Sequence, residues 1–84
     1  MRYTVDIKRS AERELDRLPH LVRGRVTVRM LALEADPRPS GSRKLRGGEG
    51  YRLRVGDYRV LYTIDDGARR VVESGVAHRR DVYR

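Results

Sequence analysis

The first half of the chain changes from an alternating pattern of apolar residues to a helical one. Residues 3–7 alternate apolar with polar side chains, which predicts a strand. Ser10 is a suitable N-cap for a helix that follows directly. Two helical stripes come next: Ala11, Leu15 and Leu18, and then Val22, Val26, Met30 and Leu33. Pro19 either ends the first helix or begins the second, and this short joint predicts a helix hairpin that stops before Asp36-Pro37.

After a loop-like stretch from Asp36 to Gly50, the apolar period returns to two. Alternation over residues 51–55 and 58–64, and a valine-rich segment at 70–76, predict three more strands. Strands joined by tight turns pair antiparallel, and the two helices then cover one face. The expected fold is a single α+β domain over residues 1–84, in which a two-helix hairpin packs on a small antiparallel sheet in the order β-α-α-β-β-β.

The Gly56-Asp57 turn also predicts which residues face each other. A two-residue loop pairs Val55 with Tyr58, Arg54 with Arg59, Leu53 with Val60 and Tyr51 with Tyr62. These apolar residues then share the core face, and Arg52, Arg54 and Arg59 share the other. Like charges across a strand pair are destabilising, and arginine cannot lose its proton. We therefore expect this face to bind an anion; the alternative is a solvated face whose arginines extend into water.

Positive charge is concentrated on the same part of the chain. The formal net charge is +8, and 18 of the 20 basic residues are arginine. Residues 38–59 account for +5 of this excess, against +2 for residues 1–37 and +1 for residues 60–84. Such clustering favours a polyanion partner, of which phosphate backbones are the commonest in cells. Codon bias toward arginine combined with solubility would explain the preference for arginine over lysine, but not the clustering.

Several classes of protein are disfavoured by what the sequence lacks. With no cysteine, only His20 and His78, and few clustered carboxylates, we expect no disulfide, metal or cofactor. The first residues alternate in polarity instead of forming a signal peptide, and the longest apolar run, residues 30–33, is far short of a membrane span. We expect a cytoplasmic protein that does not bind membranes.

The C-terminal segment, residues 75–84, holds an imidazole, two guanidinium groups and a phenol: His78, Arg79, Arg80 and Tyr83. Taken singly, His78 is equally compatible with a surface position, and Tyr83 with a packing role near the chain end. The segment is more informative in combination with three other motifs, Lys44-Leu45-Arg46-Gly47, Tyr51-Arg52-Leu53-Arg54 and Tyr58-Arg59-Val60-Leu61-Tyr62. With these motifs in this order, the chain resembles the RelE/ParE toxin superfamily over its whole length, and in particular the RelE-type messenger RNA interferases with their microbial-RNase-like fold.

The resemblance implies a toxin of a type II toxin–antitoxin system that cleaves messenger RNA on the ribosome. It implies attack of the 2′-hydroxyl on the adjacent phosphate without a metal, and a RelB-like antitoxin that forms a hetero-oligomer with the toxin. The implied catalytic residues are Arg52, Arg54, Arg59, Arg79 and Tyr83, with His78 as a further candidate. The implied RNA- or phosphate-binding residues are Arg43, Lys44, Arg46 and Arg80.

One departure from the family pattern affects the mechanism. Arg52 and Arg54 stand where the best-known family member has lysines, and arginine cannot act as a base. The base must then be another group, and Tyr83 and His78 are the candidates. The C-terminal spacing is also two residues shorter here, which puts the reach of Tyr83 in question. Two further functions stay open: a ParE-like inhibitor of DNA gyrase, and an inactive relative that only binds RNA.

Overall fold

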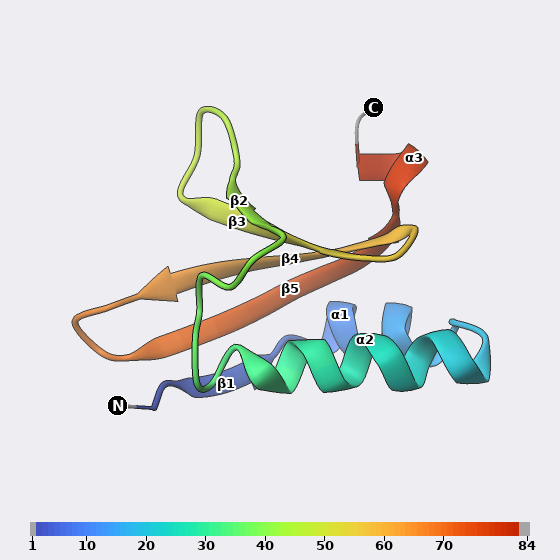
Figure 1. The fold of residues 1–84 in the computed structure, drawn as a ribbon, viewed down its shortest axis with the longest axis horizontal. Coiled ribbons are helices and arrows are strands. Elements are labelled where there is room, and N and C mark those ends of the chain that lie inside the picture. Colours follow the sequence, from blue (N-terminus) through green and yellow to red (C-terminus); the bar gives the residue numbers. More distant parts are fainter. Residues whose placement is uncertain (1, 83–84) are drawn as a thin grey trace.

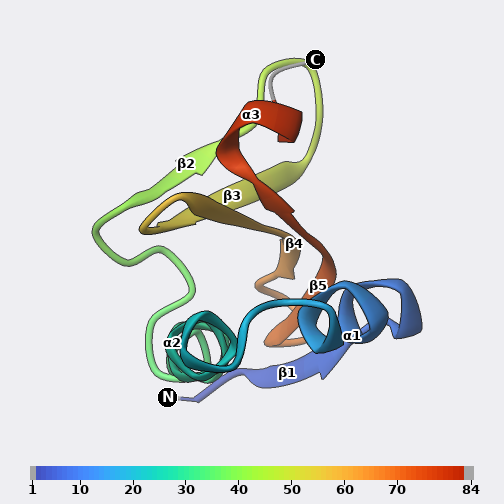
Figure 2. The ribbon, with the colours of Figure 1, turned by 90° about the vertical axis from the view of Figure 1, so that its right-hand side faces the viewer.

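The computed structural model describes residues 2–82 as one five-stranded sheet with two helices on one face (Figure 1). The elements, in chain order, are β1 (Thr4–Ile7), α1 (Arg9–Asp16), α2 (His20–Ala32), β2 (Ser42–Lys44), β3 (Gly50–Val55), β4 (Tyr58–Asp65), β5 (Arg70–His78) and α3 (Arg79–Val82). The strand order across the sheet is β1-β5-β4-β3-β2. Both views place α1 and α2 on one side of the sheet and the short α3 on the other (Figure 2).

The α+β class and the predicted succession of elements are confirmed, with two additions and one change of direction. A short strand, β2, lies within the stretch expected to be a loop, and α3 follows the last strand, which extends to His78. β1 pairs parallel with β5, whereas all the other neighbours are antiparallel. Parallel neighbours need a long crossover connection instead of a hairpin. Here the chain between β1 and β5 passes through both helices and the other three strands.

The core lies between the helices and the predicted apolar face of the sheet. Both helical stripes contribute to it, and Pro19 precedes α2 instead of ending α1. The fully buried apolar side chains are Ala11, Val26, Met30, Leu33, Leu53, Val60 and Val71, with Tyr62 nearly so. On the same face Tyr51 and Tyr58 are half-buried. The core-face assignment made from the sequence is therefore confirmed.

Beyond the end of β1, the edge of β5 is hydrogen-bonded by helix α1 and the residue before it. The Lys8 amide donates to the Glu73 carbonyl at 2.8 Å, and the Glu14 carboxylate accepts from the Val76 amide at 3.0 Å. The prediction that Ser10 caps α1 is wrong, because the helix begins at Arg9 with Lys8 as N-cap. The Ser10 hydroxyl instead donates to the Ser74 carbonyl, so this side chain also serves the edge of β5.

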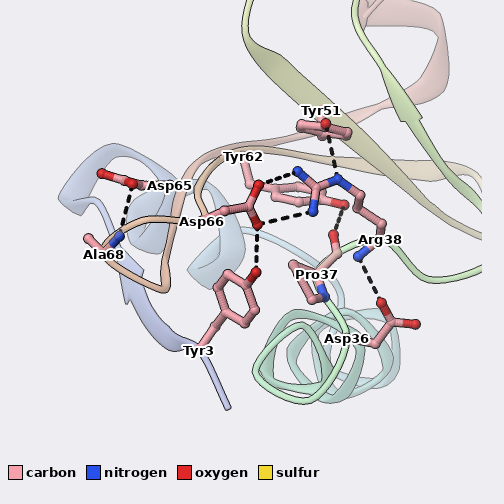
Figure 3. Close-up of polar contacts among 9 residues, drawn as sticks. All are labelled: Tyr3, Asp36, Pro37, Arg38, Tyr51, Tyr62, Asp65, Asp66 and Ala68. Carbon is pink, nitrogen blue, oxygen red and sulfur yellow. Dashed lines mark hydrogen bonds and ion pairs between the residues drawn. The ribbon is translucent and has the colours of Figure 1, made fainter. Parts of the chain in front are cut away.

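A polar network lies at the end of the core near the β4–β5 turn and fixes the connection from α2 to β2 (Figure 3). The Arg38 guanidinium donates to both Asp66 carboxylate oxygens, at 3.2 and 2.8 Å, and to the Tyr51 hydroxyl at 3.2 Å. Asp66 also accepts from the Tyr3 hydroxyl at 2.5 Å, and these bonds lower its pKa to about 2. The network joins the residue before β1, the α2–β2 connection, β3 and the β4–β5 turn.

Glu73 is a carboxyl group inside the apolar core. It faces Tyr62 across the β4–β5 pair, has no solvent exposure, and neither of its carboxyl oxygens has a hydrogen-bond partner. Burial disfavours the charged form and raises the Glu73 pKa from 4.5 to about 8. The group is therefore largely protonated at neutral pH.

We expect the free energy of unfolding to fall as the pH rises, because Glu73 ionises in the unfolded chain while it stays protonated in the folded one. Because its folded-state pKa of about 8 lies above the unfolded value of 4.5, the loss extends from pH 4.5 to 8. The free energy of unfolding decreases by about 1.4 kcal/mol or less per pH unit. Glu73→Gln stays neutral and removes this slope, which urea denaturation between pH 5 and 9 would measure. Glu12→Gln, at an exposed position of α1, is the control; equal slopes for the wild type and Glu73→Gln would contradict the prediction.

Candidate nucleic-acid interface

The arginines of the central strands lie in two neighbouring rows across the sheet. In the β3–β4 register Arg54 faces Arg59, and in the β2–β3 register Arg43 faces Arg52. Gly56 begins the connecting turn at φ 59°, a left-handed conformation that glycine adopts without strain. The predicted turn and all four predicted residue pairs are confirmed. The rows alternate with the core residues, so they occupy the face turned away from α1 and α2.

These rows line two adjoining hollows, which together we call the arginine groove. One hollow, of about 420 Å³, is lined by Gly41, Ser42, Arg43, Arg52, Arg54 and Arg59. The other, of about 700 Å³, shares Gly41, Arg54 and Arg59 and adds Arg29, Ser40, Gly56, Asp57 and Arg79. Among residues 2–82, six guanidinium groups and one carboxylate therefore line the groove. Guanidinium groups donate in a planar fork that fits the oxygens of a phosphate.

Arg59 is held at the floor of the groove. Its side chain is buried, and Nη1 donates to the carbonyls of Gly56 at 3.0 Å and Tyr58 at 2.9 Å. An arginine that extended into water would be neither buried nor fixed, so the solvated-face alternative is wrong for this residue. Nη1 supplies two of the five guanidinium N–H donors, and the other three belong to Nε and Nη2. Arg54, directly opposite, is exposed, so the facing pair combines one buried and one exposed guanidinium.

The rim of the groove is a backbone turn just before β2. Gly41 has a φ of 93°, and its carbonyl accepts from the Arg54 amide at 3.0 Å. Arg29 reaches this turn from α2, and its Nη2 donates to the Ser40 carbonyl at 3.4 Å. The Arg38 network fixes the chain only two residues before Ser40. The rim is therefore held from both the helix layer and the far end of the sheet.

Arg79 connects α3 to the turn between β3 and β4. Its amide donates to the Asp57 carbonyl at 2.7 Å, and its Nε lies 3.7 Å from an Asp57 carboxylate oxygen. Both side chains are well exposed, so this ion pair contributes little to stability. Arg79 can therefore exchange its carboxylate partner for a phosphate at small cost.

The structure brings together five of the ten residues singled out in the sequence: Arg43, Arg52, Arg54, Arg59 and Arg79. Lys44 faces Tyr51 in the neighbouring register and lines a different hollow, beside Arg38 and Asp66. Arg46 and Arg80 are exposed and line neither hollow of the groove. Tyr83 lies outside the described residues.

His78 belongs to the opposite side of the sheet from the groove. It faces Tyr58 in the β4–β5 register, and the two rings meet edge to face at 5.3 Å. Its Nδ1 accepts from the Arg80 amide at 3.3 Å, which fixes the ring at the start of α3. Ala77, not His78, stands beside Arg59 on the groove face. This geometry does not support His78 as a base at the groove.

Arg29, Gly41 and Asp57 are among the groove residues that sequence reasoning missed. Gly41 lies between two serines, Ser40-Gly41-Ser42, which is a turn signal that predicts a rim but not its position. Asp57 was used only as a turn residue, and Arg29 reaches the groove through tertiary packing that no local pattern reveals. Within residues 2–82, no three histidine, aspartate or glutamate side chains gather into a possible metal site. No helix of that part of the chain is long and apolar enough to cross a membrane.

Fold and groove together define a small α+β protein with a cationic cleft on the open face of its sheet. Residues 5–83 match the family described as the ParE toxin of the type II toxin–antitoxin system parDE. The chain is 38% identical, over its full length and 99% of the relative, to toxin RelG of Mycobacterium tuberculosis. The chain belongs to the RelE/ParE family of type II toxin–antitoxin toxins.

Solved structures of the same family have this fold. One is the toxin–antitoxin complex RelBE2 of Mycobacterium tuberculosis, at 33% identity and a TM-score of 0.84 over 94% of this chain and all of that one. Another is the RelE–RelB complex of Pyrococcus horikoshii, at 29% identity and a TM-score of 0.83 over 94% and 97% of the two chains. A mutant of Escherichia coli RelE in the free state is 26% identical, with a TM-score of 0.79 over 99% and 92%.

We expect Arg54→Gln to weaken binding of a ten-nucleotide single-stranded RNA and to flatten its salt dependence. Each phosphate contact on a single strand contributes about 0.7 to the slope of log K against log salt. The slope should therefore fall by about 0.7, measured by fluorescence anisotropy between 50 and 200 mM salt. Arg13→Gln, on the exposed side of α1, removes the same charge elsewhere and should leave the slope unchanged. Equal losses in the two variants would mean that net charge alone, and not the groove, binds RNA.

Proposed function

We propose that this toxin is a ribosome-dependent endoribonuclease that cleaves messenger RNA and so inhibits translation. The observation that carries the proposal is the arginine groove, where strands β2, β3 and β4 place Arg43, Arg52, Arg54 and Arg59 around one hollow. The solved structures named RelE support it, since their identity to this chain reaches 33%. The proposed site of action is the cytoplasm, where ribosomes and messenger RNA meet.

In this proposal the chemistry is attack of a 2′-hydroxyl on the adjacent phosphate, which leaves a cyclic phosphate and a free 5′-hydroxyl. Negative charge grows on the phosphorane oxygens as the bond forms. Arg54 and Arg59 are placed to donate to those oxygens. Arg59 is fixed by its two backbone acceptors, and a fixed donor stabilises a transition state because it needs no reorganisation. Arg79 would add charge after leaving Asp57. Guanidinium groups supply the positive charge, so the proposed mechanism requires no metal.

The proton of the attacking hydroxyl must pass to a group other than arginine. His78 lies on the far face of the sheet, and its Nδ1 already accepts from the Arg80 amide. We therefore assign the proton transfer to Tyr83, on the family resemblance. Asp57 is the carboxylate that lines the groove, and it is the alternative acceptor if Tyr83 has no role.

The partner that we propose is a RelB-like antitoxin in a hetero-oligomeric complex. Solved relatives include a RelBE2 complex and a RelE–RelB complex. A chain of net charge +8 with a cationic groove favours an acidic partner, because complementary charge accelerates encounter and fixes the register of binding.

A gyrase inhibitor is the second candidate, because the matching family is named for ParE. A paired assay separates the two functions. Purified toxin should cleave messenger RNA in a ribosome-containing translation extract, detected by primer extension, and should not inhibit supercoiling by DNA gyrase. Arg54→Ala should lower the cleavage rate by about 10²-fold or more, the cost of removing one transition-state donor. Inhibition of gyrase without cleavage would replace the proposal with the ParE-like function.

Three single substitutions identify the group that transfers the proton. Tyr83→Phe keeps the ring and should lower the cleavage rate by roughly 10²–10⁴-fold, the usual contribution of general acid–base catalysis. His78→Ala and Asp57→Asn should each stay close to the wild-type rate in the same assay. If Tyr83→Phe cleaves normally and one of the other two does not, the assignment moves to that residue.

A further inference from the structure

The two hollows of the arginine groove are neighbours that differ in charge. Among residues 2–82, four guanidinium groups and no carboxylate line the smaller hollow. The larger hollow shares Arg54 and Arg59 with it and adds Arg29 from α2, together with the Arg79–Asp57 ion pair. The groove therefore offers two adjacent places for an anion, with Arg54 and Arg59 common to both.

The groove holds more positive charge than one phosphate neutralises. Within the described part of the chain, no carboxylate forms an ion pair with Arg29, Arg43, Arg54 or Arg59. A phosphate in an RNA backbone carries a single negative charge. One bound phosphate leaves most of this positive charge uncompensated, and the next phosphate along the strand is attracted to the remainder.

Arg29 is the guanidinium group that the larger hollow gains from the helix layer. Its side chain is half-buried, and its Nη2 donates to the Ser40 carbonyl at 3.4 Å. This contact is long, and it uses one of the five N–H donors of the guanidinium group. Arg29 is therefore directed at the groove and keeps donors for an anion.

Gly41 keeps the space between Arg29 and Arg54 open. Its φ of 93° favours glycine, and a Cβ there would lie 3.7 Å from the Arg54 carbonyl oxygen and 3.8 Å from Arg29 Nη2. A side chain at this position would project between the two arginines, where both hollows are lined by Gly41. Because there is none, an extended RNA backbone has room to pass from one hollow to the other.

We propose that the larger hollow is a subsite for the RNA phosphate adjacent to the scissile one, and that Arg29 is its ligand. The inference rests on the proposed function and adds that the groove recognises two consecutive phosphates. The scissile phosphate occupies the smaller hollow, and its neighbour lies past Gly41 against Arg29. Asp57 repels a phosphate and pairs with Arg79, so Arg29 supplies the uncompensated charge that is particular to this subsite.

The experiment titrates the isotope-labelled full-length toxin with 2′-O-methyl RNA trinucleotides, which lack the attacking hydroxyl, and obtains Kd from NMR shifts at physiological salt. One ligand has both phosphates charged; the others carry a neutral methylphosphonate at one linkage or the other. The wild type should bind the two-phosphate ligand about fivefold more tightly than either one-phosphate ligand, the upper range for an exposed charge pair.

Arg29→Gln should remove this fivefold advantage and leave the Kd of the one-phosphate ligands unchanged, which also reports an intact fold. Arg25→Gln, one turn earlier on α2 and outside both hollows, removes the same charge and should change none of the three Kd values. Arg43→Gln, which lines only the smaller hollow, should weaken all three ligands. With the ten-nucleotide RNA, Arg29→Gln should also lower the salt slope by about 0.7.

Three results would overturn the inference. Equal wild-type affinity for all three trinucleotides means that the groove holds one phosphate, while the proposed function stands. Equal weakening of the one-phosphate and two-phosphate ligands by Arg29→Gln means that Arg29 acts at the scissile phosphate or through net charge. If the trinucleotides do not bind measurably, an unchanged salt slope of Arg29→Gln on the ten-nucleotide RNA excludes the subsite. Cleavage in the translation extract is read separately, so loss of the subsite and loss of the proposed function are distinguishable.

Discussion

The two-residue turn at Gly56-Asp57 is the constraint on which the rest of the molecule depends. It fixes the β3–β4 register, in which Leu53 and Val60 enter the core while Arg54 and Arg59 face away from it. Side chains alternate between the faces of a sheet, so a slip of one residue would bury both arginines and expose the apolar residues. One turn thus sets the core and the groove together.

The groove concentrates like charges, and the surrounding structure holds them in place. Arg59 gains two backbone carbonyl acceptors at the turn, and Arg79 gains a nearby carboxylate. The rim is fixed indirectly, because the Arg38–Asp66 pair and the Tyr62–Pro37 hydrogen bond anchor the chain that enters it. Repulsion of some tenths of a kcal/mol per facing pair is therefore opposed by contacts on the same elements.

The sequence predicted what tight turns and strong periodicity determine, and it failed where tertiary contacts decide. The β3–β4 register was predictable because a two-residue turn allows a single pairing. Strand β2 was not, since Ser42-Arg43-Lys44 has no apolar alternation and forms only by pairing with β3 at the sheet edge. The position of His78 on the helix side was not predicted, because β5 extends two residues further than its valine pattern. Arg29 reaches the groove from a different layer, which no periodicity encodes.

RNA and an acidic antitoxin, the two partners proposed for this toxin, would both contact it through the charges of the arginine groove. Arginine stays protonated at every physiological pH, so neither RNA nor an acidic antitoxin can be released by titrating the groove. Salt weakens both, because both depend on exposed charge. An apolar contact is not screened by salt, so a partner that also covered the exposed Leu21, Val28 and Leu31 would keep an affinity that RNA would lose. An apolar contact beside the cationic groove would thereby favour the proposed inhibitor over the proposed substrate without any change in the groove itself.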